Sequence, residues 1–385
     1  MPVRTLFFFL DLKGNEKNKT VKETAIQSKI ESLFRKQVQK DKKVKNAYLL
    51  VDSDKLNINI NIVEGATGHF KANINQPNHM ASLGKLFTAT VISILHEKGL
   101  LDFNDYISKY LEGDIMNRLH VFKGKDYSGQ ITIRHLLMQT SGLNDVFYHL
   151  WKKILNEPGF RTTPKDAILW GKEHLKPVAV PGKRHFYTDT NYYLLGLIIE
   201  RITNKPFHVV MHEYIFNPLG MRHAYLYGFS KPEITSEYPV AKLYIKEHDI
   251  LTIDGMHQID YAGGSVIAPL EEYLMFIKAL VNEKIIKKET LSKMISDDIW
   301  KGFPTVGFRY GYSIWKPVTI PVILPSEYNC WGCVGVTGAF MFYHPGTESF
   351  IIGTFNDFSY RGKALEFMIK KVIKNLVTYQ NKNAL

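Results

Sequence analysis

The sequence is poor in cysteine and lacks long apolar runs, and each absence excludes a class of protein. Only two of its 385 residues are cysteine, which excludes a small domain held together by disulfide bonds. No stretch approaches the roughly 18 unbroken apolar residues that a membrane-spanning helix needs. Charged residues make up 22% of the chain and hydrophobic residues 45%, so a disordered polyelectrolyte is excluded as well. We expect a soluble globular protein without a transmembrane span.

A convincing targeting segment is also missing. The apolar residues 6–10 form a shorter run than the core of a signal peptide, and no Ala-x-Ala cleavage site follows them. We therefore expect a cytoplasmic location, with an extracytoplasmic one left open.

Acidic residues are fewer than basic ones, 37 against 49, and the imbalance is concentrated near the N-terminus. Residues 13–45 contain eleven basic and four acidic residues. A solvated helix face is the simpler explanation, and contact of this Lys-rich helix with an anionic surface is the alternative. Because aromatic residues do not alternate with the lysines, we expect no nucleic-acid binding.

Hydrophobic periodicity predicts strands near both ends of the chain and helices between them. Residues 105–250 are expected to be mostly helical. The other expected elements are helices at 26–38, 82–99, 270–282 and 362–376, and strands at 47–51, 56–63, 309–315, 338–343 and 350–355. The pattern indicates an N-terminal tail (1–21), a discontinuous α/β sheet domain (22–105 and 255–380) and a mainly helical domain (106–254).

A Ser-x-x-Lys motif, Ser82-Leu83-Gly84-Lys85, begins the apolar helix at 82–99. A spacing of three places both side chains on one helix face. A serine hydroxyl needs an adjacent base, and burial can lower the pKa of a lysine enough to supply one. A second match, Ser313 to Lys316, lies in a predicted strand, where positions three apart point to opposite faces. The motif at Ser82 is therefore the candidate nucleophile site.

A tyrosine offers a second proton carrier. Tyr187 and Asp189 lie in a loop-like stretch before the apolar residues 192–196. A phenol whose pKa is lowered by a nearby ammonium could carry the serine proton. Tyrosine is common in loops, so a structural role is the alternative.

Five stretches in this order resemble the serine beta-lactamase-related family, which comprises class C beta-lactamases and penicillin-binding-protein-like serine hydrolases, including esterase-type members. They are Ser82 to Lys85, residues 131–143, residues 187–196, residues 218–221 and residues 262–264. The likeness covers roughly residues 25 to 360. It implies an α/β (α+β) fold of the beta-lactamase/transpeptidase type, in which an antiparallel sheet flanked by helices is joined to a helical domain.

The resemblance also implies roles for individual residues. Ser82 would be the acylated nucleophile, and Lys85 and Tyr187 would transfer protons. The backbone N–H of Ser82 would form one arm of an oxyanion hole. No cofactor and no metal are implied.

Two motifs depart from the family pattern. The tyrosine motif usually ends in Asn, and here it ends in Asp189, whose charge would favour the ammonium form of Lys85 and shift the role of base toward Tyr187. The family's third motif, a Lys or His followed by Thr or Ser and then Gly, is replaced by Cys333, Val334 and Gly335. In this register the N–H of Val336 is the second oxyanion arm. An alternative register, 336–338, recovers a Thr-Gly pair.

The altered third motif affects the expected substrate. A cation and a hydroxyl at this strand suit a substrate carboxylate, and Cys333 and Val334 offer neither. We expect a serine hydrolase that acts through an acyl-enzyme on a small-molecule or peptide-like ester or amide, as an esterase, a D-amino-acid amidase or peptidase, or a weak beta-lactamase. The alternative is a catalytically weakened, penicillin-binding-protein-like binding or assembly protein.

Two further motifs invite a metal or redox interpretation. Cys330 and Cys333 form a Cys-x-x-Cys, but a zinc site would need histidines from elsewhere, and redox motifs of this kind begin a helix. His208 and His212 lack the glutamate of a His-Glu-x-x-His motif. We expect incidental thiols and no metal site.

Overall fold

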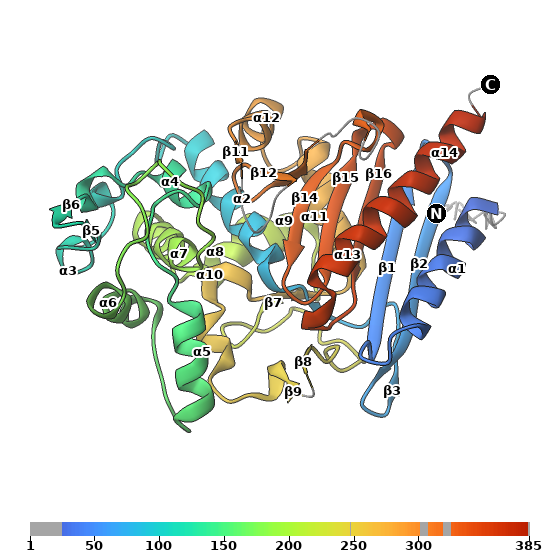
Figure 1. Cartoon of the computed structure of the whole chain (residues 1–385), viewed down its shortest axis with the longest axis horizontal. Coiled ribbons are helices and arrows are strands. Elements are labelled where there is room, and N and C mark those ends of the chain that lie inside the picture. The colour runs from blue at the N-terminus through green and yellow to red at the C-terminus, as the bar shows by residue number, and fades with distance from the viewer. Residues whose placement is uncertain (1–24, 247, 301–306, 319–324, 384–385) are drawn as a thin grey trace, which may run out of the picture.

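A large antiparallel sheet is the centre of the fold. The computed structural model describes residues 25–246, 248–300, 307–318 and 325–383, so the predicted tail (1–21) and residues 6–10 lie outside the described part. The sheet has nine strands in the order β11-β12-β13-β14-β15-β16-β1-β2-β3 (Figure 1). Its strands are β1 (Asn46–Ser53), β2 (Ile58–Thr67), β3 (Phe70–Lys71), β11 (Ile299–Trp300), β12 (Phe308–Tyr310), β13 (Trp315–Pro317), β14 (Trp331–Gly335), β15 (Ala339–His344) and β16 (Ser349–Thr354).

The two ends of the chain meet inside this sheet. β1 pairs with β16 along its length, and Leu50 lies opposite Ile352. β1 also pairs with β2, which confirms the predicted hairpin. Every residue of β1 is buried, because helices cover both faces of the sheet at this position.

One face of the sheet is covered by α1 (Ala25–Gln39), α13 (Arg361–Phe367), a π-helical segment (Met368–Ile373) and α14 (Lys374–Asn383), as Figure 1 shows. The apolar residues of α1 recur every four positions, so one stripe of the helix faces the sheet. Phe34 is in that stripe, and its ring centroid lies 5.9 Å from that of Phe355 and 6.2 Å from that of Phe367. The predicted helices at 26–38 and 362–376 are confirmed, and the second continues to Asn383.

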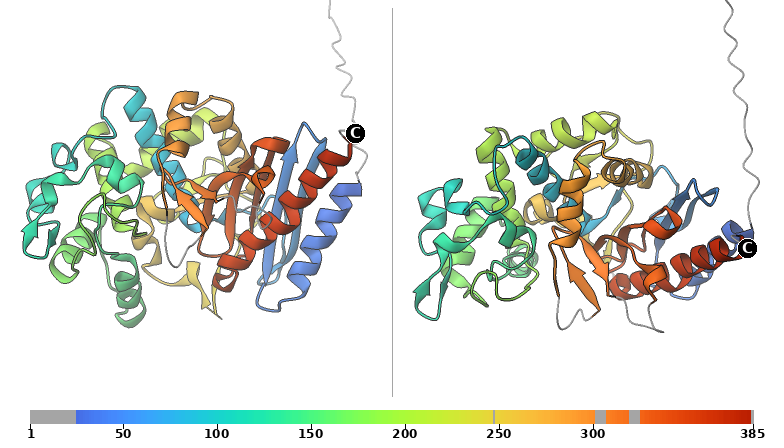
Figure 2. Two further views of the ribbon diagram at one scale, coloured as in Figure 1. Left: turned by 45° about the horizontal axis from the view of Figure 1, so that its top comes forward. Right: turned by 90° about the horizontal axis from the view of Figure 1, so that it is seen from above.

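The other face is covered by α2 (Gly84–Glu97) and α11 (Leu270–Val281). Both helices have wide apolar surfaces, and the rings of Phe87 and Phe276 stack between them with centroids 3.7 Å apart. Figure 2 shows from two further directions how these layers enclose the sheet. The predicted helix at 270–282 is confirmed. The one at 82–99 begins with a 3-10 turn (Ala81–Leu83) before α2.

The remaining helices lie mostly between α2 and α11 in the chain. They are α3 (Gly113–Met116), α4 (Ile133–Leu137), α5 (Phe147–Asn156), α6 (Pro164–His174), α7 (Thr190–Thr203), α8 (Phe207–Met211), α9 (Asn217–Leu219), α10 (Tyr261–Gly264) and α12 (Lys288–Ser296). A small sheet is formed by β4 (Asn78–His79), β10 (Val266–Ala268) and β7 (Tyr225–Leu226), and two hairpins by β5 (Val121–Phe122) with β6 (Lys125–Asp126) and by β8 (Tyr244–Ile245) with β9 (His248–Asp249).

Two sequence predictions are wrong in part. Residues 221–250 are mostly loop and short strands rather than helix. The predicted strand at 309–315 is two strands, β12 and β13, joined by a turn in which Ser313 has a φ of 62°. The turn is fixed by the Tyr312 N–H, which donates to the Met294 carbonyl at 2.9 Å. Ser313 is therefore a buried turn residue and not, as predicted, a strand residue.

The observed architecture is the mixed α/β fold with an antiparallel sheet that the sequence predicted. The domain boundaries at residues 105 and 254 stay a prediction. Among the described residues, none of the helices combines the length and the apolar character needed to cross a bilayer.

We predict that Phe34→Ala lowers the free energy of unfolding by about 3–5 kcal/mol, because it leaves a cavity between α1, the sheet and α13. Urea denaturation measures the loss. Ser32→Ala, at an exposed position of the same helix, is the control and should change the free energy by less than about 0.5 kcal/mol. Equal effects of the two substitutions would show that α1 does not pack as described.

Candidate functional site

Ser82 lies in a tight turn at the start of α2. Ala81 has a φ of 50°, in the left-handed region, and its N–H donates to Nδ1 of His79 at 3.2 Å. Ala81 and Leu83 are buried on either side of Ser82, whereas Ser82 itself is partly exposed. The turn therefore leaves the Ser82 hydroxyl accessible at the N-terminus of a buried helix.

Lys85 lies one helical turn after Ser82 and is only 2% exposed. Its Nζ donates to Ser82 Oγ at 3.2 Å and to the Gly263 carbonyl at 2.7 Å, and it forms an ion pair with Asp189. An ammonium group has three N–H donors, and three oxygen acceptors surround this one. The predicted Ser82–Lys85 contact is present.

The glycines after Tyr261 make room for this arrangement. A Cβ atom on Gly263 would lie 2.6 Å from Asp189 Oδ1 and 3.4 Å from Lys85 Nζ. A Cβ atom on Gly84 would lie 2.9 Å from the Gly264 Cα. Residues 262–264 therefore place α10 directly against α2, which brings a carbonyl oxygen to the buried ammonium.

Tyr187 completes the cluster from the loop before α7. The Lys85 Nζ lies 5.2 Å from the centroid of the Tyr187 ring, and the side chains of Ser82 and Lys85 both act on the Tyr187 phenol. Its ring also approaches those of Tyr310 and Trp315, with centroids 6.2 Å and 6.5 Å away. The structure thus brings together Ser82, Lys85, Tyr187 and Asp189, as the sequence predicted.

The electrostatics of Lys85 differ from the prediction that burial would lower its pKa. Burial does disfavour the ammonium form, but the charge of Asp189 and its hydrogen bond outweigh burial, so the pKa of Lys85 lies above its usual value. At neutral pH Lys85 is therefore an ammonium, as the Asp at position 189 led us to expect.

The pKa values of Tyr187, Asp189 and Asp145 are also shifted. Burial raises the pKa of Tyr187 and outweighs the opposing effect of the Lys85 ammonium, so the prediction of a lowered phenol pKa is wrong. Burial likewise raises the pKa of Asp189 against the effect of Lys85. Burial and the neighbouring charge of Asp189 raise the pKa of Asp145 to about 7. Asp145 Oδ1 accepts from the Asp189 N–H at 2.9 Å, so the two acids are adjacent.

The end of β14 lies against the Ser82 turn. A Cβ atom on Gly335 would lie 2.4 Å from the Met80 carbonyl oxygen and 3.1 Å from the Ala81 Cβ. Val336 directly follows Gly335 and therefore lies beside the Ser82 turn. Cys333 and Val334 lie within β14, whereas Thr337 lies in the turn after it. This placement supports the register in which Cys333, Val334 and Gly335 replace the third motif.

Cys333 does not open onto this turn. It is 2% exposed and packs in the core on the α2 side of the sheet, and burial raises the pKa of its thiol. Cys330 is also buried, in the core on the α1 side, and the two thiols form no disulfide. Among the described residues no group of three or more His, Cys, Asp or Glu is arranged to hold a metal ion.

A cavity of about 190 Å³ adjoins the Ser82 turn. Ala81 and Val336 form part of its wall, and its polar groups include the buried pair His79–Asp260, whose Nε2 and Oδ2 are 2.7 Å apart. Most of the wall is apolar and comes from α5 and the loop before α10, including Phe147, Trp151, Leu243, Ile245, Leu251 and Met256. None of the described residues that line the cavity is Lys or Arg.

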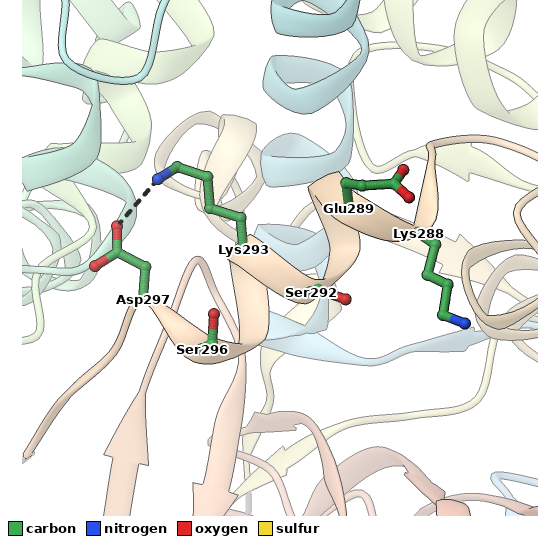
Figure 3. Close-up of a pocket in the computed structure, with 6 residues that line it drawn as sticks. All are labelled: Lys288, Glu289, Ser292, Lys293, Ser296 and Asp297. Carbon is green, nitrogen blue, oxygen red and sulfur yellow. Dashed lines mark ion pairs between the residues drawn. The ribbon is translucent and has the colours of Figure 1, made fainter.

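A larger hollow of about 560 Å³ lies elsewhere, on the outer side of α12 (Figure 3). Its lining residues come from that one helix and the residue after it: Lys288, Glu289, Ser292, Lys293, Ser296 and Asp297. Asp297 is already paired with Arg134. The hollow contains none of the clustered groups at Ser82 and is a solvated helix surface.

Three residues of the site were not identified from the sequence. His79 accepts a hydrogen bond from the N–H of Ala81 in the Ser82 turn and pairs with Asp260. Asp145 accepts a hydrogen bond from the Asp189 N–H. The available signals were positional: His79 precedes Ser82 by three residues, Asp260 directly precedes the Tyr-Ala-Gly-Gly stretch, and Asp145 closely follows Thr-Ser-Gly-Leu. Periodicity does not reveal them, because their partners are distant in the chain.

Comparisons with known proteins agree with this geometry. The sequence profile of the family described as Beta-lactamase matches residues 61–369. Penicillin-binding protein 4* of Bacillus subtilis (strain 168) is 26% identical over 246 residues, which cover 60% of this chain and 51% of that protein. The chain thus spans about half the length of the curated relatives it matches.

Solved structures establish the fold. The D-amino acid amidase from Ochrobactrum anthropi SV3 superposes with a TM-score of 0.74 at 18% identity, over 94% of this chain and 100% of that one. The D-stereospecific amidohydrolase from Streptomyces sp. gives a TM-score of 0.70 at 23% identity, over 89% of this chain and 97% of that one.

We predict that Asp189→Asn lowers the free energy of unfolding by about 3–5 kcal/mol at pH 7, because it leaves the buried Lys85 ammonium without its counter-charge. In the variant, burial lowers the pKa of Lys85 below the ordinary value of about 10.4. The folded state then binds fewer protons than the unfolded one, so the free energy of unfolding should rise from pH 7 toward pH 10.

Urea denaturation at several pH values tests this. The wild type should show no such rise from Lys85, because a raised pKa gives stability that is fully present below the ordinary lysine pKa and is lost only above it. Asp254→Asn is the control, since Asp254 pairs with Arg161 at an exposed position and should cost no more than about 1 kcal/mol. A flat pH dependence in Asp189→Asn would contradict the assignment.

Proposed function

This chain belongs to the beta-lactamase family, and on that premise we propose that it is a serine hydrolase that cleaves an ester or amide of an uncharged, apolar acyl group through an acyl-enzyme. The observation that carries the proposal is the contact of Lys85 Nζ with Ser82 Oγ at 3.2 Å inside a buried cluster that also contains Tyr187. The curated relatives and solved structures are consistent with this function, and the roles below are derived from this chain's own geometry.

Ser82 is the nucleophile in this proposal, and the ion pair of Lys85 with Asp189 generates its base. Transfer of one proton from the ammonium to the carboxylate leaves a neutral amine next to the Ser82 hydroxyl. The raised pKa of Asp189 makes this transfer cheaper than it would be to an ordinary carboxylate. The amine then takes the Ser82 proton as the oxygen attacks the acyl carbon.

Tyr187 acts as the acid. Its raised pKa keeps the phenol protonated, so it can donate that proton to the leaving alkoxide or amine. The phenolate that results is stabilised by the adjacent Lys85 ammonium. In deacylation the phenolate takes a proton from the attacking water, and Lys85 returns a proton to Ser82. The proton held by Asp189 then moves back to Lys85, which restores the starting ion pair.

Two backbone N–H groups would stabilise the tetrahedral oxyanion. One is that of Ser82, in the turn before α2. The other is that of Val336, at the end of β14, where Gly335 permits close contact with the turn. Loss of one such donor typically costs about 2.7–4 kcal/mol of transition-state stabilisation.

The cavity beside the Ser82 turn determines which acyl groups the site accepts. Its wall is mostly apolar, no Lys or Arg is found among the lining residues that the structure describes, and the third motif also lacks a cation. The Asp260 carboxylate on its wall is paired with His79 and would repel an anionic substrate. The cavity therefore favours a neutral alkyl or aromatic acyl chain over a carboxylated one such as a penicillin or cephalosporin.

We predict that Ser82→Ala abolishes hydrolysis of p-nitrophenyl butyrate, together with the burst of p-nitrophenol and the mass increase of the acyl adduct. Stopped-flow absorbance and intact-protein mass spectrometry measure both. Ser313→Ala, which removes the other Ser-x-x-Lys serine, is the matched control and should still form the adduct. Ester turnover that survives Ser82→Ala would refute the proposal.

We predict that Leu251→Trp, which narrows the cavity, lowers kcat/KM for p-nitrophenyl hexanoate by about tenfold and leaves that for the acetate within twofold, because only the longer chain reaches the cavity. Leu100→Trp, at a position 48% exposed, introduces the same side chain away from the cavity and should change neither. Equal losses for both esters in Leu251→Trp would mean that the cavity does not hold the acyl chain.

A further inference from the structure

A basic layer is formed by two segments from opposite ends of the described chain. The basic residues of 25–45 and 361–383, which we call the basic layer, number thirteen, and these segments contain only three acidic residues. The two segments comprise 44 of the 385 residues but account for a net charge of +10, out of +12 for the whole chain. The rest of the protein is therefore almost neutral.

The fold joins these charges into one surface. α1 contacts α14 and the π-helical segment before it, and the two helices run side by side over the same face of the sheet (Figure 1). Their apolar stripes, which include Phe34 on α1 and Leu376 on α14, point toward the sheet. The basic side chains therefore point outward, and all thirteen residues are exposed.

Most of this charge is not neutralised within the protein. Arg35 pairs with Glu31 and Glu64, and Lys363 and Lys370 each pair with one acid. Within the described ranges no carboxylate lies at ion-pair distance from the other ten basic residues. Lys36, Lys40, Lys371 and Lys374 are among these ten. Lys36 lies in the last turn of α1 and Lys40 directly after the helix. Lys371 lies in the π-helical segment, and Lys374 is the first residue of α14.

The chemistry of the layer favours a diffuse anionic surface over a specific ligand. Eleven of the thirteen residues are lysine, which acts as a point charge rather than a bidentate phosphate ligand. None of the large hydrophobic residues that the described part of the chain exposes lies in either segment, so bases would find no stacking partner there. A broad, lysine-rich helix face is what an acidic bilayer surface attracts.

We propose that the basic layer docks this protein on a lipid bilayer surface rich in acidic phospholipids. The cluster of Ser82 and Lys85 belongs to the core on the opposite face of the sheet from α1 and α14. Docking through the basic layer therefore leaves the candidate hydrolase site unobstructed, and binding and hydrolysis should be separable.

The test is sedimentation of the full chain with vesicles of phosphatidylcholine alone or mixed with phosphatidylserine. We expect binding only to the mixed vesicles, and loss of that binding as NaCl is raised from about 0.05 to 0.5 M, since salt screens exposed charges. The variant Lys36→Gln/Lys40→Gln/Lys371→Gln/Lys374→Gln should bind at least about tenfold more weakly, because each basic residue near such a surface changes the partition about fivefold.

A matched variant separates this surface from net charge. Lys231→Gln/Lys284→Gln/Lys287→Gln/Lys288→Gln removes the same charge from exposed lysines elsewhere and should bind as the wild type does. Hydrolysis of p-nitrophenyl butyrate should be equal in all three proteins in the absence of vesicles, which also shows that the variants fold.

Several results would overturn the proposal. They are absence of binding to the mixed vesicles, equal loss in both four-lysine variants, full binding by the variant of the basic layer, and tighter binding to a DNA duplex than to the vesicles at the same salt concentration. Should the proposed hydrolase function fail instead, the vesicle experiment stands, because circular dichroism can replace ester hydrolysis as the folding control.

Discussion

One buried ammonium group constrains the whole site. Taking a lysine charge out of water costs several kcal/mol unless other groups replace the lost hydration. For Lys85, the ion pair with Asp189, 104 residues away, and the hydrogen bond to the Gly263 carbonyl, 178 residues away, offset that cost. The three segments that meet at Lys85 must therefore be correctly packed before the charge can be buried. Formation of the reactive centre therefore depends on correct folding of these three segments.

The acid at position 189 also decides how protons can move. An asparagine there could accept a hydrogen bond from Lys85 but could not take its proton. A carboxylate holds Lys85 as an ammonium. Because burial raises the pKa of this carboxyl group, it can also receive the Lys85 proton in the reaction that we propose for Ser82. The same burial keeps Tyr187 protonated. In the proposed reaction this buried environment provides Tyr187 as the acid and the Lys85–Asp189 pair as the source of the base.

Much of the fold could be predicted from the sequence, because α1, α11 and the hairpin of β1 and β2 have strong local periodicity. The proximity of Ser82, Lys85 and Tyr187 could be predicted because these residues belong to recognisable motifs. The break between β12 and β13 could not, since it depends on a hydrogen bond from Tyr312 to Met294 that no local pattern encodes. The pKa directions also required the structure, because they follow from burial and from partners distant in the chain, such as Lys85 and Asp189, which are 104 residues apart.

The sheet separates two kinds of electrostatic environment. On the face that carries α2, the Lys85 ammonium is buried and paired with Asp189, and in the proposed reaction this pair controls single protons near Ser82. On the face that carries α1 and α14, charge is abundant, exposed and mostly unpaired among the described residues, and it can act only on an extended partner. Charges on the outer layer are screened by water and salt over roughly 10 Å, so they barely perturb the buried cluster. The protein can therefore carry a strongly basic surface without disturbing the pKa values that its proposed chemistry requires.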